Sequence, residues 1–247
     1  EKENTFKVPT KELEMAISQT VFAASSNTSR PVLSGVLFDV KKDKVKVVAT
    51  DSYRLAEKTI TLKDATDVDI ECIVPAKTVM ELGKILSREM GKEVELSVSK
   101  NQILFVAGDV KLMSRLIEGK FPPYEKVVPK ETKTKVEVLD EALANVVRRV
   151  SLFARENNNS IKLAATNDGK LTVSTDETRV GEEKAELEIS MTGENNKIAL
   201  NAQYLLDVLN YIQSDKISME IEDKLSPAVV RPVKEKDYVY IIMPLKV

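Results

Sequence analysis

The chain of 247 residues is 43% apolar and carries 37 basic and 39 acidic residues, for a formal charge of −2. This balance argues against a protein whose whole surface coats nucleic acid, although it allows a local basic stripe. Because the chain has no histidine and only 8 glycines, it excludes histidine-dependent catalysis, the commonest zinc sites and a glycine-rich phosphate loop, so we expect no catalytic residue, no metal and no cofactor.

In the first half of the chain, apolar residues at helical spacing predict a helix over 11–24 with Thr10 as its N-cap. Further along, Pro75 at a first-turn position begins a second predicted helix that ends at Arg88. Alternating or apolar stretches bounded by turn residues predict strands. The strand-like stretches of this half cover 32–38, 44–50, 54–62, 93–99, 103–107 and 110–117.

The second half follows the same order, with helices predicted over 139–154 and 202–213. Its strand-like stretches cover 160–165, 170–175, 184–189, 197–200, 216–221, 228–232 and 238–243. The order helix, strands, helix, strands predicts an α+β domain in which both helices pack on one face of an antiparallel sheet.

The segment between the two halves, residues 121–129, contains three prolines and is typical of an extended linker. We therefore predict a first domain over residues 1–121, a linker over 122–130 and a second domain over 131–247.

One motif occurs in both halves. Ala-Thr-Asp-Ser-Tyr-Arg-Leu at 49–55 returns as Ser-Thr-Asp-Glu-Thr-Arg-Val at 174–180, about 125 residues later. This period is too long for a solenoid repeat but is typical of a domain, so it predicts two tandem copies of one domain. In each copy the aspartate is expected to cap a turn and the arginine to fix that turn by ion pairing or backbone bonds. These residues are Asp51 and Arg54, then Asp176 and Arg179.

The single cysteine, Cys72, lies in the apolar run 70–74 and has no local basic partner. It is expected to be a buried structural thiol, which fits a reducing cytosol. No run of 18 apolar residues predicts a membrane span, and Glu1 begins a segment with neither an initiator methionine nor a signal-peptide profile. The start therefore indicates an interior piece or a trimmed product of a longer chain.

Basic side chains lie on or next to the predicted helices, away from the apolar stripes. They are Lys11, Lys77, Lys84, Arg88, Arg148, Arg149 and Arg155. A shared basic helix face would hold a phosphate backbone without reading sequence. Acidic residues share the same helices, so an ordinary solvated surface is the interpretation that periodicity alone favours.

Six motifs in order carry a family resemblance: FAAS at 22–25, RPVLSGVLF at 30–38, VATDSYRLA at 48–56, VPAK at 74–77, FPPY at 121–124 and IIMPLKV at 241–247. The combined pattern resembles the bacterial DNA polymerase III β subunit, the sliding clamp family. The resemblance covers essentially the whole chain but matches only the family's middle and C-terminal domains.

The resemblance implies a DNA-clamp fold and a processivity factor built from three-domain subunits in a head-to-tail homodimeric ring. Helices would line a central hole around duplex DNA and contact its backbone without sequence specificity. The family's N-terminal domain is expected to be missing from this chain, so the piece should be unable to close the normal ring. The implied location is the bacterial cytoplasm, in association with the nucleoid, with no membrane partner.

The resemblance also implies a peptide-binding pocket between the two domains. There the DNA polymerase III catalytic subunit, the clamp loader and repair proteins would dock short clamp-binding peptides. Carried over by motif, the pocket residues are Arg30, Leu33, Thr50, Ser52, Tyr53, Arg54, Leu55, Pro122, Lys126, Val127, Pro227, Val229, Ile241, Met243, Pro244 and Leu245.

Without the family, Leu55, Ile241 and Met243 would be interpreted as core residues. The chain also departs from the usual pattern at Tyr53, where the family often has histidine, at Pro123, where it often has aspartate, and in its last residues. Because of these departures, the peptide preference of the pocket is expected to differ from the usual one in the family. The pocket itself is expected to persist, because apolar exchanges of similar size are tolerated.

Two alternatives stay open. A free-standing two-domain peptide-binding module would use the same pocket without encircling DNA. A small-molecule enzyme would need a polar cluster such as Asp51, Arg54 and Lys58 to be catalytic, whereas such a group is more typical of a fold-stabilising ion pair.

Overall fold

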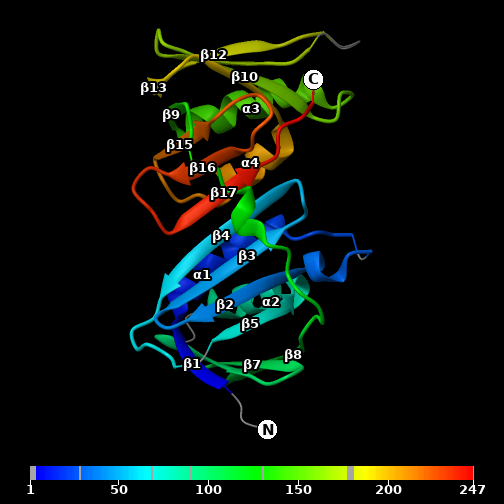
Figure 1. The fold of residues 1–247 in the computed structure, drawn as a ribbon, viewed down its shortest axis with the longest axis vertical. Helices are drawn as coiled ribbons and strands as arrows, with labels where there is room; N and C mark the ends of the chain where they lie inside the picture. The colour runs from blue at the N-terminus through cyan, green and yellow to red at the C-terminus, as the bar shows by residue number, and fades with distance from the viewer. Residues whose placement is uncertain are drawn as a thin grey trace. The chain divides into compact units, whose positions relative to one another are not determined.

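A computed structural model of the protein describes residues 4–27, 29–67, 69–88, 91–129, 131–176 and 181–246. The chain divides into two compact units, unit 1 over Glu1–Pro122 and unit 2 over Pro123–Val247. Within these described ranges each unit is β-rich and contains two α-helices (Figure 1). The α+β class and the tandem duplication predicted from the sequence are therefore confirmed.

Unit 1 forms two antiparallel sheets with strand orders β1-β6-β7-β8 and β4-β3-β2-β5. In chain order its elements are β1 (Asn4–Pro9), α1 (Thr10–Thr20), the 3₁₀ turns η1 (Val21–Ala23) and η2 (Pro31–Ser34), β2 (Gly35–Lys41), β3 (Lys44–Thr50), β4 (Arg54–Thr61), β5 (Ile70–Pro75), α2 (Ala76–Leu86), β6 (Glu93–Val98), β7 (Gln102–Ala107) and β8 (Val110–Arg115).

Unit 2 repeats this plan, with strand orders β12-β11-β10-β14 and β13-β9-β15-β16-β17. Its elements are the 3₁₀ turn η3 (Tyr124–Val127), β9 (Thr134–Leu139), α3 (Asp140–Ala154), β10 (Ser160–Thr166), β11 (Lys170–Ser174), β12 (Lys184–Glu188), β13 (Ser190–Gly193), β14 (Asn196–Asn201), α4 (Ala202–Tyr211), β15 (Lys216–Ile221), β16 (Ala228–Pro232) and β17 (Tyr238–Ile242). Apart from η3 and β13, each of these elements of unit 2 has a counterpart in unit 1.

The core of unit 1 lies between its helices and its two sheets. Helices α1 and α2 pack on each other, and together they contact strands of both sheets. The helices approach closely because Gly83 has no side chain: a Cβ at this position would lie 3.0 Å from Ile17 Cγ2. The two sheets meet through Phe38 of β2 and Phe105 of β7, whose buried rings have centroids 6.3 Å apart.

Unit 2 is built in the same way. Helices α3 and α4 pack on each other and bury their apolar faces, which include Leu143, Val147 and Leu205. On β17 the buried Tyr240 donates a hydrogen bond from its hydroxyl to the Tyr204 carbonyl of α4, at 3.0 Å. The last strand of the chain is thereby fixed to the last helix.

The structure corrects three local predictions. Thr10 is the first residue of α1 and not its cap, because β1 continues through Pro9 directly into the helix. The strand expected from residue 32 begins at Gly35, since Pro31 starts the 3₁₀ turn η2. The segment expected to be an extended linker contains η3.

The aromatic contact between the sheets of unit 1 yields a stability prediction. Phe38→Ala should lower the free energy of unfolding of unit 1 by about 3–5 kcal/mol, because it opens a cavity at a fully buried position. Guanidinium denaturation followed by far-UV circular dichroism would measure this. Met113→Ala on β8 is the control, since that side chain is 66% exposed and its loss should change the free energy by less than about 0.5 kcal/mol. Equal effects of the two substitutions would contradict this account of the core.

Candidate functional site

The first copy of the repeated motif forms a tightly bonded turn between β3 and β4. Asp51 Oδ1 accepts hydrogen bonds from the backbone N–H groups of Tyr53 and Arg54, at 2.9 and 3.0 Å. Thr50 donates from Oγ1 to the Arg54 carbonyl at 2.6 Å and accepts at the same oxygen from the Ser52 N–H at 3.1 Å. Short polar side chains that bond to the backbone two or three residues ahead favour a turn over a continued strand.

The Arg54 guanidinium connects this turn to the 3₁₀ segment that follows α1. Its Nε lies 3.1 Å from Asp51 Oδ2, and its Nη2 donates to the Phe22 carbonyl at 2.9 Å. The guanidinium carbon also lies 5.7 Å from the centre of the Phe22 ring, within the range of a cation–π contact. The structural role predicted for Asp51 and Arg54 is therefore confirmed.

The turn presents two side chains to solvent. Tyr53 is 63% exposed. Ser52 adopts a positive φ of 80°, a region that costs a non-glycine residue free energy unless its surroundings hold it there. Arg30 approaches the same residue, with Nη1 3.3 Å from Ser52 Oγ. Arg30, Ser52 and Tyr53 thus form an exposed polar and aromatic group on unit 1.

The other predicted residues of unit 1 differ in exposure. Leu33, Thr50 and Leu55 are buried. Leu33 is fixed by its backbone, because its N–H donates to the Arg30 carbonyl at 3.0 Å and its carbonyl accepts from the Ser25 N–H at 2.8 Å. Pro122, the last residue of unit 1, is exposed.

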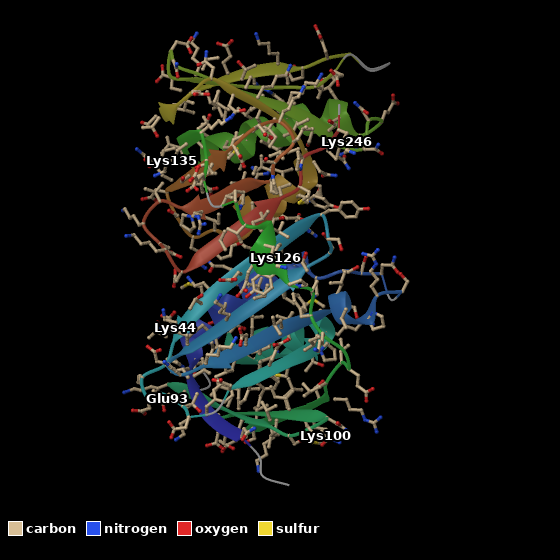
Figure 2. All side chains as sticks on the ribbon, in the orientation of Figure 1. Lys44, Glu93, Lys100, Lys126, Lys135 and Lys246 are labelled. Carbon is tan, nitrogen blue, oxygen red and sulfur yellow. The ribbon has the colours of Figure 1, made fainter. Side chains whose placement is uncertain are left out.

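In unit 2, Lys126 and Val127 lie on η3 and are exposed, and Figure 2 labels Lys126. Val229 of β16 and Ile241 of β17 face each other across the strand pair and are each 1% exposed. The interpretation of Leu55 and Ile241 as core residues is therefore correct for both. The half-buried residues of the predicted set in unit 2 are Pro227, Met243, Pro244 and Leu245.

The residues after β17 continue along β14. The Leu245 N–H donates to the Ala199 carbonyl at 2.8 Å, so the C-terminal segment is held by the main chain of that strand. Beside this segment unit 2 has a cavity of about 560 Å³. It is lined by Lys162, Lys197, Ile198, Ala199, Lys224, Leu225, Leu245 and Lys246. Only Leu245 was predicted, although the exposed Leu225 between polar neighbours is a signal that sequence reasoning missed.

All seven basic residues singled out on the helices are exposed: Lys11, Lys77, Lys84, Arg88, Arg148, Arg149 and Arg155, together called the helix cations. Lys84 Nζ pairs with Glu81 at 3.2 Å, and Arg149 Nε pairs with Glu183 at 3.0 Å. Arg148 Nη1 donates to Asn145 Oδ1 at 2.9 Å. The other helix cations form no ion pair with any described residue, so their charge faces solvent.

The second copy of the motif is used differently. Asp176 forms an ion pair with Lys162 of β10, and Thr175 Oγ1 accepts a hydrogen bond from the Glu183 N–H at 3.2 Å. Arg179, predicted to fix this turn, lies outside the described residues.

Family models match almost all of the chain. The model for the central domain of the DNA polymerase III beta subunit matches residues 7–123, and the model for its C-terminal domain matches residues 125–246. The chain belongs to the DNA polymerase III β subunit family.

Individual relatives support this assignment. A curated protein named "Beta sliding clamp" from Staphylococcus aureus strain Mu50 is 29% identical over 246 residues, which are 99% of this chain and 65% of that protein. The crystal structure of the DNA polymerase sliding clamp from Bacillus subtilis is 30% identical with a TM-score of 0.94, over 100% of this chain and 65% of that one. A sliding clamp from Pseudomonas aeruginosa bound to griselimycin is 29% identical with a TM-score of 0.94, over 99% and 66%. The chain thus spans about two thirds of the length of these relatives.

Outside these surfaces, the described part of the chain offers few side chains that could take part in a reaction or hold a metal. The Cys72 thiol is buried, and burial raises its pKa to about 12, with a smaller contribution from Glu71. Lys58 is buried on β4, away from solvent. Within the described ranges no group of three or more carboxylate, thiol or imidazole side chains could hold a metal ion. No helix among the described residues is long and apolar enough to cross a membrane.

The carboxyl group of Asp140 lies where burial disfavours its charged form. Asp140 begins α3, and its buried Oδ1 has no hydrogen-bond partner among the described residues. Burial raises the pKa of the Asp140 carboxyl to about 6, although Arg148 opposes the rise, and Glu141 adds to it. Ionisation of this group therefore weakens the folded state of unit 2.

The sign of the resulting pH dependence follows from linkage. Since the folded pKa lies above the unfolded value of about 3.9, the contribution of Asp140 to stability is complete below about pH 4 and is lost as the pH rises through about 6. Asp140→Asn removes this ionisation, so the stability of the variant relative to the parent should increase between pH 4 and pH 7. Urea denaturation at both pH values would measure the difference. Glu156→Gln, at an exposed position beyond the C-terminal end of α3, should show no such change, and a pH-independent difference for Asp140→Asn would contradict the prediction.

Loss of the Arg54 donors should also destabilise unit 1. Arg54→Met keeps an apolar stem but removes the donors to the Phe22 carbonyl and to Asp51 Oδ2, at an expected cost of about 1–3 kcal/mol in the free energy of unfolding. Lys41→Met is the control, because Lys41 is largely exposed and its pair with Asp39 is worth less than about 1 kcal/mol. Denaturant midpoints that do not differ between the two variants would show that the Arg54 contacts do not hold the turn.

Proposed function

We propose that the chain acts within a DNA sliding clamp, a replication processivity factor that encircles duplex DNA and tethers the replicative polymerase. The observation that carries this proposal is the succession of two β-subunit domains over residues 7–123 and 125–246, each with the fold of solved clamps. The head-to-tail homodimeric ring belongs to the same proposal.

The helix cations support a DNA-facing role. Exposed lysines and arginines attract phosphates without reading bases, which suits a protein that must move along any sequence. Several of these side chains already share their charge with a carboxylate or an amide of the same unit. Weak phosphate contacts of this kind suit a ring that stays on DNA because it encloses the duplex. Tight phosphate contacts would slow its sliding.

Partner proteins are proposed to dock short peptides on the predicted pocket residues of both units. The turn fixed by Arg54 presents Tyr53 and Ser52 at low conformational cost, and the C-terminal segment presents the half-buried Met243, Pro244 and Leu245. The proposed partners are the DNA polymerase III catalytic subunit, the clamp loader and repair proteins. The fold of the Pseudomonas aeruginosa relative accepts griselimycin, so a ligand site is compatible with this architecture.

No chemistry is needed for this function. A clamp increases the local concentration of its bound polymerase at the DNA, and that raises processivity without any catalytic group. We propose that the protein is not an enzyme and works in the bacterial cytoplasm at the nucleoid.

Peptide binding provides the test. A fluorescent peptide rich in glutamine, leucine and phenylalanine should bind the chain saturably in an anisotropy titration. Tyr53→Ala in unit 1 and Met243→Ala in unit 2 should each raise Kd by about tenfold, the equivalent of about 1.4 kcal/mol for loss of one apolar anchor. Met113→Ala, at an exposed methionine outside the predicted set, should leave Kd unchanged. Absence of saturable binding to the folded parent, or equal Kd values for all four proteins, would contradict the proposed docking residues.

A further inference from the structure

The cavity beside the C-terminal segment combines two kinds of surface. Its apolar part is formed by Ile198 and Ala199 of β14 with Leu225 and Leu245. Its basic part consists of four lysines, one from each of four separate segments of unit 2: Lys162 of β10, Lys197 of β14, Lys224 of the loop between β15 and β16, and Lys246 near the C-terminus. These eight residues are called the lysine pocket, and Figure 2 labels Lys246 at the end of the last segment.

Hydrogen bonds hold both exposed edges of the lysine pocket in place. In the loop between β15 and β16, Asp223 Oδ1 accepts from the Leu225 N–H at 2.8 Å and from the Ser226 N–H at 2.7 Å. These bonds keep the pKa of the Asp223 carboxyl below its usual range. Leu225 is thereby held 65% exposed beside the cavity, an unusual position for a leucine in a fixed turn. The opposite edge is fixed by the bond between Leu245 and Ala199.

Three of the four lysines in the lysine pocket have no ion-pair partner among the described residues, although the Asp223 carboxylate lies at the edge of the pocket. Lys162 pairs with Asp176, but Lys197, Lys224 and Lys246 form no ion pair with any described residue. A second cavity of about 410 Å³ adjoins the first and shares Lys197 and Lys224 with it. None of the described residues that line either cavity is acidic. Like charges gathered in a concave site repel one another and attract an anion from outside.

We propose that the lysine pocket binds an acidic residue that adjoins an apolar residue in a partner peptide. The apolar side chain would cover Leu225 and Leu245, while the carboxylate would lie among the unpaired ammonium groups. This inference rests on the proposed peptide-binding function and specifies a charge preference within it. Partners with an aspartate or glutamate at this position would be favoured over neutral ones.

A nucleic acid fits the lysine pocket less well. Proteins that bind single strands stack bases on aromatic side chains, and the described lining contains none. The aliphatic part, with its exposed Leu225, makes no favourable interaction with a phosphate, whereas it can bury the apolar side chain of a peptide.

The test is a set of labelled peptides rich in glutamine, leucine and phenylalanine. In each peptide one position carries either aspartate or asparagine, and the position moves along the sequence. With the parent chain, aspartate at one position next to an apolar residue should lower Kd by about tenfold relative to asparagine. In the double variant Lys197→Glu/Lys224→Glu this preference should vanish or reverse. Lys162 is left unchanged because it pairs with Asp176.

Two controls separate charge effects from damage to the fold. Lys236→Glu, an exposed lysine in the loop between β16 and β17, should keep the aspartate preference. The asparagine peptides should bind the double variant within about threefold of the parent, which also shows that the variant is folded.

Three results would decide against the inference. If aspartate and asparagine peptides bind the parent equally at every position, the charge preference is wrong while the peptide-binding function stands. If no peptide binds the folded parent, the proposed function itself fails and the inference fails with it. A third result combines three observations: a short single-stranded oligonucleotide binds the parent, this binding is lost in the double variant, and no peptide shows an aspartate preference. In that case the lysines bind phosphate groups and not a peptide carboxylate.

Discussion

The exposed turn that we propose as the docking surface of unit 1 depends on one side chain that is itself mostly buried. The Arg54 guanidinium joins the turn after β3 to the 3₁₀ segment after α1, through Asp51 on one side and the carbonyl and ring of Phe22 on the other. With this bridge in place, Ser52 tolerates a positive φ and Tyr53 projects into solvent at a fixed position. A preorganised turn of this kind costs little entropy when a ligand binds. Arg54 therefore supports the exposed residues of the turn.

The duplication gives both units the same frame and leaves their surfaces free to differ. In each unit the elements follow the same order, and two helices contact strands of two antiparallel sheets. In unit 2, however, Asp176 pairs with Lys162 on β10, so the second copy of the motif borders the lysine pocket. Unit 1 thus offers an exposed tyrosine and unit 2 an exposed leucine among lysines. A peptide that used both would meet an aromatic and polar surface at one point and a cationic, aliphatic one at another.

The sequence predicted the helices and most strands, because their apolar periodicity is strong and occurs twice. Strands β1, β5, β9 and β13 were not predicted: β5 and β9 lead directly into helices, and β13 is only four residues long. Thr10 was misjudged as a cap because its residue type is common there, while the chain geometry places Pro9 in that role. The lysine pocket could not be predicted from the sequence. Its lysines come from four segments that only the fold of unit 2 brings together.

We propose that a clamp-binding peptide contacts the turn at Ser52 and Tyr53 and the C-terminal segment at Met243–Leu245. Amide chemical shifts in a ¹H–¹⁵N correlation spectrum, followed during titration with the unlabelled peptide, test it residue by residue. Because Pro244 has no amide N–H, we expect progressive shifts at the other four positions, Ser52, Tyr53, Met243 and Leu245, and none along β6 to β8. Saturable binding with shifts confined to other surfaces, or no shifts at these positions in a large excess of peptide, would contradict this proposal.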